Sequence, residues 1–116
     1  MSYTWLQPTL ERISDLLKLP DRHNSYGSAK VDPDVVLNVL DFLSDHMGSE
    51  DPLPTIIPTP VGGLHLEWKG ISTSCVADFN PGGLYAAFYG LKEVSGIDEA
   101  GALLEHALMI FSSETL

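Results

Sequence analysis

The alternation of apolar and polar residues between Leu64 and Phe88 restricts the possible folds of this chain more than any other feature. Leu64, Leu66 and Trp68 alternate with polar neighbours, and the same period of two continues through residues 71–79 and 84–88. A period of two is typical of β-strands that bury one face. The segment therefore predicts an antiparallel meander.

Turn residues predict how these strands pair. Lys69-Gly70 is typical of a two-residue hairpin turn, and the Asn80–Gly83 segment of a type II turn, because proline suits its second position and glycine its third. The predicted cross-strand pairs are Trp68 with Ile71, Leu66 with Thr73, Leu64 with Cys75, Phe79 with Leu84, Ala77 with Ala86 and Cys75 with Phe88. Both turns place apolar residues on one face. The other face is expected to carry His65, Glu67, Lys69, Ser72, Ser74, Val76, Asp78, Tyr85 and Tyr89.

Two helices are predicted ahead of the sheet. The first runs to about Lys18, and the second from about Pro33 to Met47, with Asp32 as N-cap and Gly48 as the stop after it. The expected buried positions are Leu6, Leu10, Ile13 and Leu17 in the first helix, and Val36, Val39, Leu40, Leu43 and Met47 in the second.

The remaining elements complete the predicted fold class. Residues 55–59 contain Pro58, which confines them to an edge strand, and a last helix is predicted from about Ile97 or Asp98 to Phe111. At 116 residues the chain is long enough for one domain and too short for two. The sequence therefore predicts a single α+β domain, residues 1–116. Two N-terminal helices precede an antiparallel meander of three to four strands, and the C-terminal helix packs on one sheet face.

Charge restricts the possible partners. Sixteen acidic residues against six Lys and Arg give a net charge of −10, which disfavours contact with nucleic acid or anionic membranes. No Lys or Arg occurs between Val31 and Trp68 or after Lys92. The single cysteine, Cys75, and the lack of a long apolar run predict a cytoplasmic protein. Acidity serves solubility as readily as it serves binding to a basic partner.

The reactive side chains form no pattern typical of catalysis. A thiol nucleophile needs a nearby base, and the predicted register places His65 on the sheet face opposite Cys75. The histidines His23, His46, His65 and His106 are scattered, without the spacing of a metal site. We therefore expect no enzyme, no metal and no cofactor.

Two segments remain as candidate binding surfaces. One is an acidic stripe, Asp34, Asp41 and Asp45, with the Glu50-Asp51 loop beyond it, which could attract a basic partner. The alternative is an ordinary solvated helix face. The other candidate is the loop with Arg22, His23 and Tyr26, where the tyrosine could anchor a partner or simply fix the loop to the core.

Two motifs give the chain a resemblance to known proteins. Asn24-Ser25-Tyr26-Gly27-Ser28 is followed by a proline-initiated helix, and residues 58–68 read Pro-Thr-Pro-Val-Gly-Gly-Leu-His-Leu-Glu-Trp. Over residues 20–90 this resembles a loose group of small bacterial and mobile-element proteins. The group has tryptophan and aspartate where this chain has His23 and Asn24. The resemblance implies a bacterial or phage origin and no particular activity.

These features together predict a small acidic protein-binding module without enzymatic activity. The role that these features favour is an inhibitor or neutraliser of a basic protein, such as an antitoxin, an immunity protein or a phage anti-defence protein of the anti-CRISPR type. The alternative is a structural subunit that acts as a homodimer or within a larger complex, through the uncovered sheet face or the edge strand.

Overall fold

The computed structural model describes residues 4–19 and 29–114 of the chain. Its elements follow one another in the order α1 (Leu6–Leu17), α2 (Pro33–His46), β1 (Thr55–Pro58), β2 (Leu64–Lys69), β3 (Ser74–Asn80), β4 (Gly83–Tyr89), β5 (Lys92–Val94) and α3 (Ile97–Glu114). The predicted α+β class is confirmed. No helix among the described residues has both the length and the apolar character needed to cross a membrane.

The sheet has five antiparallel strands in chain order, with β1 and β5 at its edges. The prediction of three to four strands is therefore too low. Sequence reasoning missed β5, because its three residues, Lys92–Val94, are too few to display a period of two. The proline-containing strand β1 lies at an edge as predicted, since Pro58 has no N–H to donate to a second neighbour.

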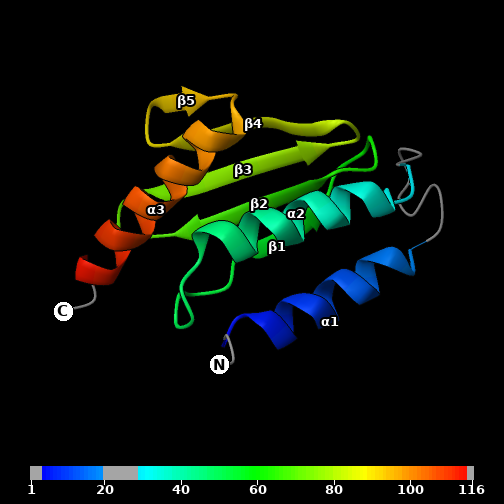
Figure 1. Ribbon diagram of the computed structural model, residues 1–116, viewed down its shortest axis with the longest axis horizontal. Coiled ribbons are helices and arrows are strands. Elements are labelled where there is room, and N and C mark those ends of the chain that lie inside the picture. The colour runs from blue at the N-terminus through cyan, green and yellow to red at the C-terminus, as the bar shows by residue number, and fades with distance from the viewer. Residues whose placement is uncertain (1–3, 20–28, 115–116) are drawn as a thin grey trace.

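Helices α2 and α3 lie against the same face of the sheet, and α1 lies beyond the β1 edge (Figure 1). The packing of the C-terminal helix on one sheet face is thus confirmed. The core between sheet and helices is built by fully buried side chains from both layers, including Val39, Leu43, Leu66, Phe79 and Leu104.

The predicted cap of α2 is present. Asp32 has extended backbone angles and its side chain accepts a hydrogen bond from the Asp34 backbone N–H at 2.9 Å, with Pro33 as the first helical residue. Val35 and Phe42, which widen the predicted apolar side of α2, are buried. The buried face differs from the prediction at Leu40, which is only half-buried, and at Leu37, which is 60% exposed.

Helix α1 buries a different stripe from the predicted one. Thr9, Ile13 and Leu16 are buried, whereas Leu10 is 39% exposed. The prediction counted apolar residues only, and so it overlooked the buried threonine. The helix is connected to the rest of the fold by hydrogen bonds, among them one from Trp5 Nε1 to the Gly48 carbonyl at 2.9 Å.

The predicted register of β2 with β3 is wrong by four residues. Trp68 lies opposite Cys75, and Leu64 opposite Phe79. The chain makes a longer turn than Lys69-Gly70, closed by a bond from the Gly70 N–H to the Thr73 carbonyl at 2.8 Å. A shift of four residues is even, so the residues of β2 and β3 keep their predicted faces. Ile71, which was predicted on the apolar face opposite Trp68, lies instead in the turn and is 76% exposed.

Strand β4 contains a β-bulge that the sequence did not reveal. Phe79 pairs with Leu84 as predicted, but Asp78 pairs with Ala86, which leaves Tyr85 without an opposite residue. One extra residue exchanges the two faces beyond it. The prediction that Tyr89 lies on the uncovered face is therefore wrong, and its ring packs against α3.

Candidate functional site

The covered side of the sheet presents a strongly acidic outer surface. Helices α2 and α3 together carry seven carboxylates and neither contains a Lys or Arg. We call this set the acidic layer: Asp34, Asp41, Asp45, Asp98, Glu99, Glu105 and Glu114. All are exposed except Glu114, which is half-buried. Because the two helices lie side by side on one face, their charges add to a single electrostatic surface (Figure 1).

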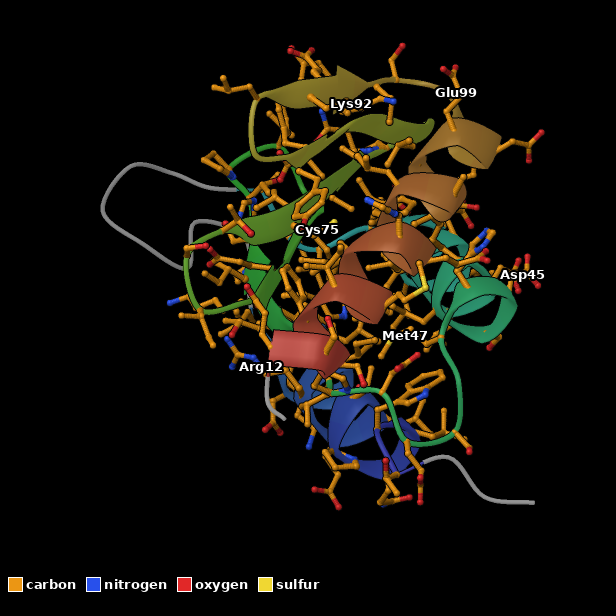
Figure 2. The ribbon with its side chains drawn as sticks, turned by 90° about the vertical axis from the view of Figure 1, so that its left-hand side faces the viewer. Arg12, Asp45, Met47, Cys75, Lys92 and Glu99 are labelled. Atoms are coloured by element: carbon orange, nitrogen blue, oxygen red, sulfur yellow. The ribbon has the colours of Figure 1, made fainter. Side chains whose placement is uncertain are left out.

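Three of the predicted site residues belong to this layer. Asp34, Asp41 and Asp45 are all exposed on α2, and Figure 2 shows Asp45 directed away from the sheet. The other acidic candidates follow the helix. Glu50 is exposed, while Asp51 is half-buried and its Oδ2 accepts a hydrogen bond from the Gly48 N–H at 2.6 Å.

The second predicted surface belongs to the segment of the chain between α1 and α2. Arg22, His23 and Tyr26 lie outside the described residues.

The residues of the predicted acidic stripe and of the loop beyond it lie in different hollows. Asp45 lines a hollow between α2 and the β3–β4 hairpin, together with Asn38 and Phe42. Asp51 instead lines hollows along α3. The structure therefore does not bring Asp45 and Asp51 into one hollow, and the acidic surface continues from α2 onto α3.

His46 joins the two acidic helices. Its Nδ1 lies 2.6 Å from Glu105 Oε2, and its ring centroid lies 5.1 Å from that of Phe42. The ring also lies directly over Gly101, where a Cβ atom would come within 2.2 Å of it. The helix dipole alone explains His46 from the sequence. The contact with Glu105, which is 59 residues away, is visible only in the structure.

A groove runs along the C-terminal half of α3. It consists of two adjoining hollows of about 460 and 540 Å³ that share Asp51, Leu108 and Ser112. We call it the α3 groove. One end lies beside His46 and Glu105, and the other beside Gly70 and Ile71. Sequence reasoning missed this groove because its walls come from α3, the loop after α2 and the β2–β3 turn.

A further hollow lies between the β4–β5 edge and the first half of α3. Tyr89, Lys92, Glu99 and His106 surround an apolar floor there. The rings of Tyr89 and His106 meet edge-on with centroids 6.0 Å apart. In Figure 2, Lys92 and Glu99 are found on β5 and on the first turn of α3 respectively.

Cys75 lies apart from these surfaces. Its side chain is buried at 2% exposure, and desolvation by burial raises its pKa from the ordinary value of 9.0 to about 12. His65 lies on the opposite sheet face, as predicted, where its Nδ1 is 2.5 Å from Asp78 Oδ1. A protonated, buried thiol behaves as a small apolar side chain.

Within the ranges 4–19 and 29–114, no three His, Cys, Asp or Glu side chains converge to hold a metal ion. Comparisons with protein-family models, with curated proteins and with solved structures give no match.

Proposed function

We propose that this protein is a non-enzymatic binding module that attaches to a basic protein surface through the acidic layer. Its role in this proposal is to inhibit or neutralise that partner, as an antitoxin, an immunity protein or an anti-defence protein of the anti-CRISPR type does. Two adjacent helices with seven carboxylates and no Lys or Arg are the observation that carries the proposal.

Electrostatics favours this use of the layer. A surface of one sign accelerates encounters with an oppositely charged partner and opposes partners of the same sign. A partner that binds nucleic acid would offer the complementary basic surface, and carboxylates on the two helices could occupy it in place of phosphates.

The position of Asp45 adds to the argument. It is the penultimate residue of α2, where the negative end of the helix dipole makes a carboxylate unfavourable by about 0.3–1 kcal/mol. Its side chain contributes charge to the surface at a cost in helix stability. A role in binding accounts for such a residue, whereas solubility alone would be served by a carboxylate anywhere on the surface.

The test compares two matched double variants. D41N/D45N removes two exposed charges four residues apart on α2, and E11Q/D15N removes two exposed charges four residues apart on α1. Each immobilised protein is exposed to lysate of its natural host, and retained proteins are eluted with increasing salt. We expect the partner to be basic, to be retained by wild type and E11Q/D15N, and to elute early from D41N/D45N.

Two results would contradict the proposal. One is a retained partner that binds both double variants equally. The other is retention that does not change between about 0.05 and 0.5 M salt, since charge contacts at a surface are screened over this range.

The uncovered sheet face favours a second candidate, a subunit that associates with another chain through this face. Ile57 is 45% exposed there, and the half-buried Val76 and Phe88 lie opposite each other on β3 and β4. Sedimentation of the V76S variant beside wild type tests this. Wild-type dimers that dissociate in V76S and that persist in high salt would favour the second candidate.

A further inference from the structure

The α3 groove combines an apolar floor with an acidic rim. Leu108 and Phe111 form its floor at 5% and 6% exposure, and Met109 and Ile71 project beside it at 64% and 76% exposure. Large apolar side chains that are this exposed and border one depression are typical of a contact surface.

The rim is made of carboxylates. Glu50, Asp51, Glu105 and Glu114 line the two hollows, and Lys69 is the one Lys or Arg among the described lining residues. Such a rim opposes a nucleic acid, an anionic membrane and a second copy of this acidic chain. It attracts a segment that carries Lys or Arg.

Contacts within the protein hold the walls of the α3 groove in position. A Cβ atom on Gly70 would lie 2.4 Å from the Phe111 ring, so the β2–β3 turn is in close contact with α3. The Ile71 backbone N–H also donates to Glu114 Oε1 at 3.1 Å. At the other end, the contact of His46 with Glu105 connects α2 to α3. A groove formed before binding needs little ordering when a ligand enters, which favours affinity.

From these observations we propose that the α3 groove binds a basic segment of the partner protein, with one apolar side chain of that segment inserted over Leu108 between Met109 and Ile71. This inference rests on the proposed function and assigns its contact site. The two hollows, of about 460 and 540 Å³, lie within the range of ligand pockets and are large enough for a side chain of any size. Arg or Lys residues that flank the anchor would meet the rim.

The test uses a display library of short random peptides, selected on wild-type protein. The selected peptides are then measured against two double variants. I71S/M109S alters the groove, while Y85S/L91S removes two other exposed apolar side chains, which are 67% and 106% exposed. Because all four side chains are exposed, we expect both variants to fold. A circular dichroism spectrum of each verifies this.

We expect the selected peptides to share Lys or Arg residues around one large apolar residue. Their affinity should fall about tenfold or more in I71S/M109S, which is the effect of removing contacts at the centre of an interface. Affinity for Y85S/L91S should equal that for wild type. Titration of labelled wild-type protein should shift the backbone resonances of residues 108–112 and 70–72.

The outcomes separate this inference from the proposed function. If peptides and the natural partner lose affinity in D41N/D45N but not in I71S/M109S, the acidic layer binds basic proteins elsewhere and the groove assignment is wrong. If selected peptides need the groove but carry no positive charge, the groove does not take a basic segment and the assignment is wrong, while the proposed function is still decided by D41N/D45N. Dilution-dependent self-association that I71S/M109S abolishes would identify a second copy as the occupant and would likewise overturn the assignment.

Discussion

The buried thiol of Cys75 couples the stability of the protein to alkaline pH. Burial raises its pKa from 9.0 to about 12, so the folded protein holds this proton at pH values where the unfolded chain has released it. The unfolded state then binds fewer protons than the native state, and the free energy of unfolding falls as pH rises above about 9.

The predicted loss approaches about 1.4 kcal/mol per pH unit above the pKa of the unfolded thiol, and amounts to about 1.6 kcal/mol between pH 9 and 10.5. Urea unfolding of wild type and Cys75→Ala across this range measures it. The small cavity in Cys75→Ala should lower its stability by a constant amount. The difference between the two proteins should therefore shrink as pH rises, and a constant difference would contradict the raised pKa.

At the contact between α2 and α3, Gly101 has no room for a larger side chain. Alanine normally stabilises a helix interior by about 1 kcal/mol relative to glycine. Here the new methyl group would lie 2.2 Å from the His46 ring, which Glu105 and Phe42 hold in place. We expect Gly101→Ala to lower the free energy of unfolding by about 1–3 kcal/mol, as overpacking does.

A double-mutant cycle provides the control. In the His46→Ala background the obstructing ring is absent, so Gly101→Ala should stabilise the protein, by an amount close to the helix propensity difference. Thermal unfolding of the four proteins gives the coupling energy. A destabilisation of the same size in both backgrounds would mean that the His46 ring is not the obstacle.

At the scale of elements, Arg12 connects α1 to the edge of the sheet. Its Nε donates to the Ile56 carbonyl of β1 at 3.1 Å. An edge strand presents unpaired backbone groups, and this side chain satisfies one of them. We expect Arg12→Met to destabilise the protein by about 0.5–1.5 kcal/mol and to accelerate hydrogen exchange in β1.

Lys18→Met is the matched control, because it removes another cation from the end of the same helix. It should leave hydrogen exchange in β1 unchanged. Equal acceleration in both variants would show that the loss of positive charge, and not the bond to Ile56, protects the strand.

Elements with strong local signals were predictable from the sequence, and those fixed by distant contacts were not. The cap at Asp32 and the turn with positive φ at Gly82 depend on neighbouring residues only, and both occur as predicted. The β2–β3 turn differs because Gly70 packs on Phe111, 41 residues later in the chain. The bulge at Tyr85 left no signal in the alternation, since alanines occupy both faces just after it.

The candidate site shows the same division. The acidic residues of α2 were identifiable because a run without Lys or Arg is visible in the sequence. The α3 groove was not, because it depends on the side-by-side packing of α3, the loop after α2 and the β2–β3 turn. The sequence has no Lys or Arg after Lys92, which indicates an acidic α3. It does not indicate that other segments pack beside this helix to form a groove.

At the scale of the whole molecule, a net charge of −10 opposes the compact state through self-repulsion. This repulsion is uneven. On α2, Asp41 and Asp45 are four residues apart without a Lys or Arg on the helix, whereas α1 carries Arg12 near its own Glu11 and Asp15. Like charges at this spacing destabilise a helix by about 0.2–0.5 kcal/mol, and Asp45 also opposes the helix dipole.

D41N/D45N should therefore be more stable than wild type by about 0.5–1 kcal/mol at low salt, and E11Q/D15N should gain less, because Arg12 offsets part of the repulsion on α1. Added salt screens the repulsion, so the advantage of D41N/D45N should diminish as ionic strength rises. Urea unfolding at several salt concentrations measures this.

If D41N/D45N gains stability while it loses the basic partner, the same two carboxylates weaken the free fold and strengthen the complex. A D41N/D45N protein no more stable than wild type at low salt would mean that these charges do not strain α2, and the cost assigned to Asp45 would then be wrong.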